Sequence, residues 1–402
     1  MIHSTHFPNG LRLITQFTPS IRSAALGVWL INGVRHQRPE TNGYAHLLEH
    51  LLFKGAGTLN ALDLAHRLDQ FGGQVNAQTG RELTAFYGLV PSDDVANLLD
   101  LLIHMLLTPR FDDTDVEMER SVVMQEMACV AADPAQAVEE YAIGRAWAKH
   151  PLGWPLLGEP SVIEQAQSAS LRTYLAELLR GNRLVVVAVG RVKHAVLEAV
   201  CRLPSHLPAG DAPETIAPIF SPGSWTEHYP YTQSHCHWLL PVPAPSDSGY
   251  PALLVANHLL GGGTASRLFQ KLRVAHGLSY DVQTRLEFYS DTGLWQIGAV
   301  CDPIRAEQCR QIVSETLQQL LDEGPTEQEL SGAKRHLSAN LILEQDNSLQ
   351  CMGRLALEAC YRDYHPSEAE YQAWIGDVGA DQVRHVLQTA WQQAVQVVWS
   401  PE

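Results

Sequence analysis

The chain has 402 residues, 45% of them hydrophobic, so it is long enough to bury large cores and favours two domains of similar size. Its 28 Lys and Arg residues against 44 Asp and Glu residues give a formal net charge of -16, which opposes the phosphate neutralisation that nucleic-acid binding requires. We therefore expect no nucleic-acid partner.

The cysteines and the N-terminus indicate the compartment. An odd set without CxxC spacing, in a chain too long to need disulfides, favours reduced and mostly structural thiols. The N-terminus lacks the basic and apolar segments of a signal peptide, and no run of about 18 apolar residues occurs. We expect a soluble, cytoplasmic protein without a membrane partner. The seven cysteines are Cys129, Cys201, Cys236, Cys301, Cys309, Cys351 and Cys360.

The first half of the chain, residues 1–203, mixes strand-like and helix-like patterns. In chain order we predict strands at 11–16 and 24–31, helices at 43–54 and 61–71, strands at 74–79 and 84–90, helices at 93–107 and 114–130, and a strand at 183–189. A proline-rich stretch, residues 204–224, has little apolar periodicity and predicts a linker between domains.

The second half, residues 225–402, repeats much of this order. We predict a strand at 236–240, helices at 250–260 and 265–275, strands at 279–286 and 293–300, and a helix at 306–321. In each half a short turn and a further helix follow, near Asp113 and Thr326. We predict two homologous α+β domains, each a mostly antiparallel sheet with helices packed on one face.

The sequence His46-Leu47-Leu48-Glu49-His50 carries the chemistry. Histidines four residues apart share one face of a helix and are close enough to bind one tetrahedral ion. Glu49 lies about 60° around the helix from His46, near the metal without being forced to bind it. This HxxEH order is typical of inverzincins. Taken alone, the motif also fits two ordinary histidines on an amphipathic helix.

A catalytic zinc ion needs a third protein ligand and an open fourth position. Glu119 and Glu126 are two helical turns apart and therefore face the same side of their predicted helix. Without further information, two such glutamates are typical of a solvated stripe.

Two stretches, from Gly43 to Gly55 and from Glu119 to Glu126, resemble the pitrilysin/insulinase peptidases (family M16). The resemblance is closest to their short two-domain branch (M16B), which includes the mitochondrial processing peptidase. It covers nearly the whole chain, including Gly27-Val28-Trp29, Gly33-Val34-Arg35 and the stretch from Gly73 to Thr79. It implies the LuxS/MPP-like metallohydrolase architecture in both domains.

The resemblance also implies roles for individual residues. One Zn²⁺ per chain would be held by His46, His50 and Glu126, with Glu49 as the catalytic base and Glu119 as a supporting carboxylate. In the second half, Arg273 and Tyr280 resemble the pair that these peptidases bring to the substrate, where a guanidinium and a phenol supply donors to the peptide carbonyl. Gly261-Gly262-Gly263 resembles the family's glycine-rich loop and equally fits a helix C-cap followed by a turn.

The function so implied is that of a zinc-dependent endopeptidase acting on peptides or unfolded segments in a closed chamber. Asn76, Ala77 and Gln78 would form a strand edge to which the substrate adds as a further strand. Family members of this length form dimers with an identical chain or an inactive paralogue. The Arg/Tyr pair would then reach the zinc site of the other chain, and a homodimer would be geometrically sufficient.

Three other functions remain open. One is an inactive or weakly active peptide-binding subunit of a heterodimeric peptidase, although all ligands and the base are present here. Another is a structural zinc protein, which three protein ligands and an open position disfavour. The third is a dedicated peptidase for a cofactor or natural-product precursor. A separate pair, His235 and His237, shares one face of a strand with Cys236 on the other, and no carboxylate or second cysteine nearby in sequence completes a site.

Overall fold

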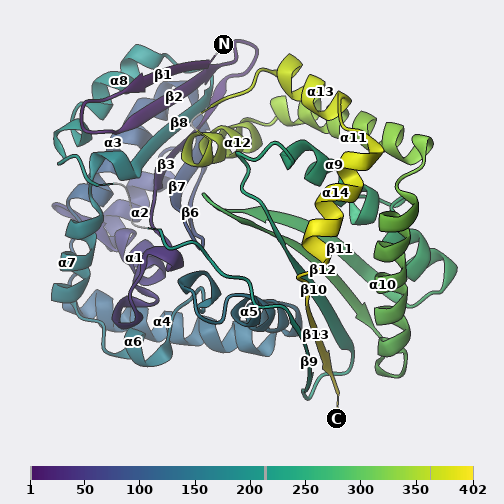
Figure 1. Cartoon of the computed structure of the whole chain (residues 1–402). Helices are drawn as coiled ribbons and strands as arrows, with labels where there is room; N and C mark the ends of the chain where they lie inside the picture. The colour runs from purple at the N-terminus through teal and green to yellow at the C-terminus, as the bar shows by residue number, and fades with distance from the viewer. Residues whose placement is uncertain (1, 212–214, 363, 402) are drawn as a thin grey trace. The chain divides into compact units, whose positions relative to one another are not determined.

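The computed structural model describes residues 2–211, 215–362 and 364–401. The chain forms two units, each built around one large β-sheet (Figure 1). Unit 1 contains Met1–Cys129, Trp154–Ile216 and Glu344–Asp363, and unit 2 contains Val130–Gly153, Ala217–Leu343 and Tyr364–Glu402.

Unit 1 holds a six-stranded sheet in the order β1-β2-β8-β3-β7-β6. The central strands β3 and β8 are almost entirely apolar and buried, which is the pattern of strands covered on both faces. β6, at the edge, alternates exposed and half-buried residues. The strands are β1 (Ile2–His6), β2 (Arg12–Phe17), β3 (Ser23–Leu30), β6 (Gln74–Thr79), β7 (Thr84–Pro91) and β8 (Leu184–Gly190), and a separate small hairpin joins β4 (Gly55–Ala56) to β5 (Leu59–Asn60).

Unit 2 holds a five-stranded sheet in the order β11-β12-β10-β13-β9. Its strands are β9 (Gly223–His228), β10 (Ser234–Val242), β11 (Ser279–Phe288), β12 (Gly293–Cys301) and β13 (Val395–Ser400).

The two sheets are built alike. Read from its edge strand β6, the sheet of unit 1 begins with the order β6-β7-β3-β8-β2. Read from its edge strand β11, the sheet of unit 2 has the order β11-β12-β10-β13-β9. In both series the last pair is parallel and the preceding pairs are antiparallel. The predicted repeat of one α+β unit is confirmed by this matching strand order.

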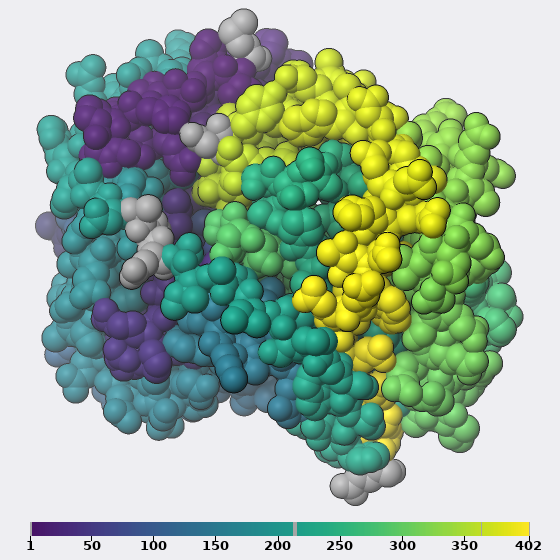
Figure 2. All heavy atoms as spheres, in the orientation of Figure 1, coloured from purple at the N-terminus to yellow at the C-terminus, as the bar shows by residue number. Residues whose placement is uncertain are grey.

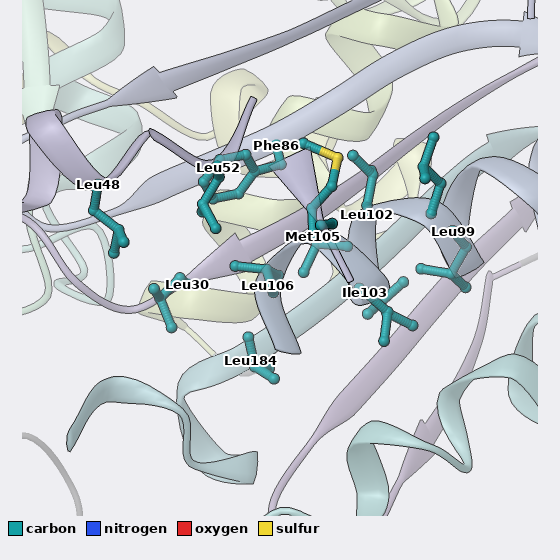
Figure 3. Packing of buried hydrophobic residues seen from close by; sticks show 14 of the residues in the cluster. Leu30, Leu48, Leu52, Phe86, Leu99, Leu102, Ile103, Met105, Leu106 and Leu184 are labelled. Atoms are coloured by element: carbon teal, nitrogen blue, oxygen red, sulfur yellow. The ribbon is translucent and has the colours of Figure 1, made fainter. Parts of the chain in front are cut away.

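Helices of unit 1 pack their apolar residues against the sheet. Figure 3 shows Leu48 and Leu52 of α1, Phe86 of β7, and Leu102 and Leu106 of α3 in one buried cluster. The helices are α1 (Tyr44–Leu52), α2 (Ala61–Asp69), α3 (Val95–Leu107), α4 (Asp113–Ala132, which extends past the boundary of the unit), α6 (Pro160–Glu164), α7 (Ser168–Leu178), α8 (His194–Cys201) and α12 (Ser348–Tyr361).

Helices of unit 2 follow the same principle. Figure 2 shows α14, in yellow, along the surface, and its buried residues Val383, Leu387 and Ala390 belong to the core of the unit. The helices are α5 (Pro134–Ala146), α9 (Tyr250–Gly261), the π-helix η7 (Phe269–Ala275), α10 (Ala306–Glu323), α11 (Glu327–Gln345, which extends past the boundary of the unit), α13 (Glu368–Gly376) and α14 (Ala380–Trp391).

Each sheet carries helices on both faces, so the prediction of helices on one face only is wrong. In unit 1, α12 packs against β3 and β8 through Met352, Leu355 and Ala359. In unit 2, α5 packs against β10 and β13 through Val138 and Ile143. These two helices occupy equivalent places in the two repeats. α5 comes from the first half of the chain but belongs to unit 2, and α12 comes from the second half but belongs to unit 1. Each helix therefore packs on the sheet of the other repeat.

The units therefore do not follow the predicted division at residues 203 and 225. Segment 130–153 belongs to unit 2 and segment 344–363 to unit 1, while the main boundary falls between Ile216 and Ala217 inside the predicted linker, residues 204–224. Residues 212–214 of that linker lie outside the described residues. Among the described helices, none combines the length and apolar character needed to cross a bilayer.

Candidate metal centre

Helix α1 carries both histidines of the motif and is buried on nearly all sides. Gly43 precedes it with φ of 102°, in the left-handed region that favours glycine. A Cβ at this position would come within 2.7 Å of Ile163 Cδ1 and 2.8 Å of the Leu157 carbonyl oxygen. Glycine at position 43 therefore allows the close packing that fixes where the helix begins and where its histidines point.

His46, His50 and Glu126 bring three potential ligand atoms together. Glu126 Oε2, from α4, lies 3.6 Å from His46 Nε2 and 3.5 Å from His50 Nε2. The three atoms all lie within 4.8 Å of one another. A tetrahedral zinc ion with bonds of about 2.1 Å would hold its ligand atoms about 3.4 Å apart. The geometry of this group thus fits a zinc ion.

The protonation of His46 also suits a metal ligand. Burial, and then the charge of neighbouring His50, lowers the pKa of His46 to about 4. The ring is therefore neutral near pH 7 and keeps a lone pair on one nitrogen. The two imidazole rings lie 4.6 Å apart between centroids and are tilted by 67°, so neither stacks over the other.

Glu119 fixes the orientation of His50. Its Oε2 atom lies 2.9 Å from His50 Nδ1, and Lys54 Nζ lies 2.6 Å from Oε1. With a proton on Nδ1 donated to Glu119, His50 Nε2 is left free to bind a metal. Burial alone would raise the pKa of Glu119, but hydrogen bonds and charges from Lys54 and His50 hold it below the usual value. Glu119 is therefore an anion despite being only 3% exposed.

Glu49 lies beside the metal-ligand group rather than within it. Its Oε2 accepts a hydrogen bond from the Thr79 hydroxyl, at the end of β6. Burial raises the pKa of Glu49, while Thr79 and the charge of His50 oppose the rise and the charge of Glu126 adds to it. A carboxylate with a raised pKa next to a metal group is a candidate general base.

The strand that carries Thr79, β6, is an edge strand of its sheet. β6 pairs with β7 on one side, and no other described strand pairs with it on the outer side. Asn76 and Gln78 are exposed and Ala77 is half-buried. Within this stretch the Ala77 N–H donates to Asn76 Oδ1 at 2.9 Å, and Thr79, whose hydroxyl donates to Glu49, follows directly.

Arg273 and Tyr280 lie together in unit 2. The Arg273 guanidinium lies 4.2 Å from the centroid of the Tyr280 ring and 5.0 Å from that of Phe269. Arg273 Nη1 also donates to the Tyr280 carbonyl oxygen at 3.4 Å. The predicted helix at 265–275 is in fact a π-helix over its last seven residues, and Arg273 lies on it. Tyr280 is 80% exposed, so its ring is accessible within the unit.

The structure brings together the five predicted residues of unit 1, His46, Glu49, His50, Glu119 and Glu126. It adds two that sequence reasoning missed. Lys54 follows the C-terminal end of α1, four residues after His50. In the predicted helix at 43–54 this spacing places both residues on one face and could have indicated a contact with Glu119. Thr79 ends a correctly predicted strand, but only the three-dimensional fold shows that it contacts Glu49.

Cys236 lies in a cluster with two other cysteines. Cys301 and Cys309, which are distant in sequence, lie within 4.8 Å of it, sulfur to sulfur. His235 and His237 point away from these thiols, as their alternation along β10 predicted.

Comparison with known families matches two models that cover most of the chain. Residues 12–160 match the model described as "Insulinase (Peptidase family M16)". Residues 165–337 match the model described as "Peptidase M16 inactive domain". The first match contains every residue of the candidate metal centre.

Relatives match along nearly the full length. A protein of Mycobacterium tuberculosis named as an uncharacterized zinc protease is 33% identical, over 97% of this chain and 92% of its own. The beta subunit of the mitochondrial-processing peptidase of Bos taurus is 29% identical, over 95% of this chain and 80% of its own. Among solved structures, a protease from Helicobacter pylori has a TM-score of 0.91 at 20% identity, covering 100% of this chain and 99% of its own. The last match bears on the fold alone.

Proposed function

Because this chain belongs to the insulinase family of peptidases, family M16, we propose that it is a zinc-dependent endopeptidase that hydrolyses peptides or unfolded segments. The observation that supports this most is the convergence of His46, His50 and Glu126, with their donor atoms spaced as a zinc ion requires. Three protein ligands leave one position for water or substrate.

The proposed chemistry divides between the metal and Glu49. A zinc ion, when bound, would polarise the scissile carbonyl and make a nearby water more acidic. Glu49 takes the proton from the attacking water and later passes it to the departing amine. The burial that raises the pKa of Glu49 makes its carboxylate a stronger base, and the Thr79 hydroxyl holds it in place.

Residues around the ligands keep them in the reactive arrangement. Glu119 accepts the Nδ1 proton of His50, and Lys54 balances the charge of Glu119. Such support holds the ring in one tautomer, so the metal-binding nitrogen needs no rearrangement before it binds.

The substrate is proposed to add to β6 as an additional strand at Asn76, Ala77 and Gln78. The exposed outer edge of β6 supports this, as does the hydrogen bond between Thr79 and Glu49, which links the strand to the proposed base. Main-chain hydrogen bonds would supply most of the affinity, so the enzyme would accept many unfolded sequences.

Arg273 and Tyr280 are proposed to donate to the substrate carbonyl and to the oxyanion that develops on it. Their mutual contact and the exposure of Tyr280 are compatible with this role. We further propose a dimer with a closed chamber. A relative named as a subunit of a processing peptidase supports an assembly of more than one chain.

Substitution of Glu49 by Gln tests the proposal. The variant should bind zinc as the original chain does and cleave an unfolded peptide roughly 100- to 10,000-fold more slowly, because only proton transfer is lost. Glu117→Gln, on the exposed side of α4, is the matched control and should retain activity. Retained cleavage by Glu49→Gln at normal zinc content would refute the proposed base.

A peptide-binding subunit without activity is the second candidate. It would bind zinc and an unfolded peptide but give no chelator-sensitive cleavage in the purified chain. Activity that appears only on addition of a paralogous chain would favour it.

A further inference from the structure

Unit 2 contains a cluster of three thiols that the proposed peptidase chemistry does not use. Cys236 and Cys309 are 0% exposed and Cys301 is 2% exposed. Their sulfur atoms all lie within 4.8 Å of one another, and none is in a disulfide. Three of the seven cysteines, separated by 65 and 8 residues in sequence, thus meet at one point.

The cluster results from the packing of two strands and one helix. Cys236 on β10 and Cys301 on β12 both face the core of unit 2, together with Trp238 and Ile297. α10 packs on these strands and presents Cys309 from its first turns.

A disulfide between Cys236 and Cys301 does not explain the cluster. Cys236 pairs with Ala299 and Cys301 pairs with Ser234, so the two cysteines are diagonal neighbours on adjacent strands. Diagonal neighbours have Cα atoms about 7–8 Å apart, which exceeds the usual span of a disulfide. A disulfide would also leave the third thiol without a role.

We propose that Cys236, Cys301 and Cys309 form a binding site for a soft, closed-shell cation, Cu⁺ in particular. With metal–sulfur bonds of about 2.3 Å, a trigonal ion holds its sulfur ligands about 4 Å apart, which is compatible with the observed spacing. Sulfur ligands favour Cu⁺, whereas a structural zinc ion requires a fourth ligand, and no fourth His, Cys, Asp or Glu among the described residues joins the group.

Binding forms copper–sulfur bonds and releases thiol protons to solvent, without any change of oxidation state. The negative charge that remains on the sulfur atoms lies near the N-terminal end of α10, where Cys309 is the fourth residue of an 18-residue helix. The helix dipole favours negative charge at that end.

The neighbouring edge strand offers a route for the ion. β11 pairs with β12 from Ser279, opposite Cys301, and its register shifts between Ser279 and Val282. The two residues inside the shift, Tyr280 and Asp281, are exposed. Such an irregular strand end opens locally at a lower free energy than a regular ladder does.

The site is distinct from the candidate zinc centre in both place and chemistry. The thiols lie in unit 2, while His46, His50 and Glu126 lie in unit 1 and offer only nitrogen and oxygen. A sulfur-only coordination shell is therefore a readout that the zinc centre cannot produce.

The test measures Cu⁺ binding to the full chain under anaerobic, reducing conditions, with a chromophoric Cu⁺ chelator as competitor. Copper is supplied both to the folded protein and during refolding, so that slow access to a buried site does not hide binding. We expect one Cu⁺ per chain with an X-ray absorption spectrum of sulfur ligands only. Cys309→Ala and Cys301→Ser should each weaken binding by at least about 100-fold, more than loss of an outer-shell partner does.

Cys129→Ser, which removes an exposed thiol, is the matched control and should bind Cu⁺ unchanged. Circular dichroism establishes that each variant is folded, and two separate ligand variants guard against misfolding of either one. The proposal is overturned if the original chain takes up no Cu⁺ by either route. It is also overturned if folded Cys309→Ala or Cys301→Ser binds as tightly as the original, or if the spectrum contains nitrogen or oxygen ligands.

Discussion

The hydrogen bond between Glu119 and His50 leads to a quantitative prediction for Glu119→Gln. The two atoms lie 2.9 Å apart, and the Glu119 side chain is only 4% exposed, so solvent cannot replace it. Glutamate accepts from His50 with one oxygen and from Lys54 with the other. Glutamine has one acceptor oxygen for these two donors, so one of them must lose its partner.

If the amide oxygen stays with His50, Lys54 must turn away, which its 31% exposed side chain permits. If the oxygen stays with Lys54, the amide N–H faces His50 Nδ1 and drives the proton to Nε2, the nitrogen proposed to bind zinc. Loss of such an outer partner weakens metal binding by roughly 10- to 100-fold, or about 1.4 to 2.8 kcal/mol.

The assay is competition for zinc with a chromophoric chelator, performed on Glu119→Gln and on the control Glu117→Gln. Glu117 is exposed on the same helix, so its substitution removes the same charge without touching His50. We expect a weakened zinc affinity in the first variant and no change in the second. Equal affinities for the two variants would show that Glu119 does not position His50.

Three further predictions follow from other contacts. His46→Ala and Glu126→Ala each remove a proposed ligand and should abolish stoichiometric zinc in elemental analysis, while zinc retained by both would contradict the assignment. Thr79→Val removes a hydrogen-bond donor that lowers the pKa of Glu49, so the pKa of Glu49 should rise. The acidic limb of the profile of kcat/KM against pH should then move to higher pH. An unmoved limb would count against Glu49 as the base. Arg35 and Glu82 form an ion pair of 2.7 Å, and their side chains are 1% and 2% exposed. Arg35→Met breaks this pair and should lower the free energy of unfolding, measured in urea, by roughly 3–5 kcal/mol. Arg38 is 61% exposed, so Arg38→Met should lower the free energy of unfolding by only about 0–1 kcal/mol. Similar losses in the two variants would refute the role of burial.

The ion-pair partner of Arg35 is a feature that the sequence does not predict. Gly33-Val34-Arg35 was recognised only as part of a family resemblance. The structure gives Arg35 a buried partner, Glu82, which is 47 residues away in the chain and lies in the turn between β6 and β7. No local spacing rule connects two residues at that separation.

The helices and strands were predicted best where apolar periodicity is strong. β6 was predicted at its observed bounds, and α3, β8 and β12 to within one or two residues. The helix over residues 265–275 was predicted in position but not in type, because a segment of seven residues is too short for its apolar spacing to distinguish the wider π turn from an α turn.

The sequence by itself determined the elements, their repetition and the pairing of His46 with His50, because each depends on contacts between residues close in the chain. Only the tertiary structure decided which distant side chains meet: Glu126 at the two imidazoles, Thr79 at Glu49, and three cysteines in one core. It also decided that α12 and α5 cover the sheets of the opposite repeats. An apolar helix face indicates that the helix must be buried, but it does not indicate which sheet will cover it. The reason is that the hydrophobic effect depends on the area buried and has no direction.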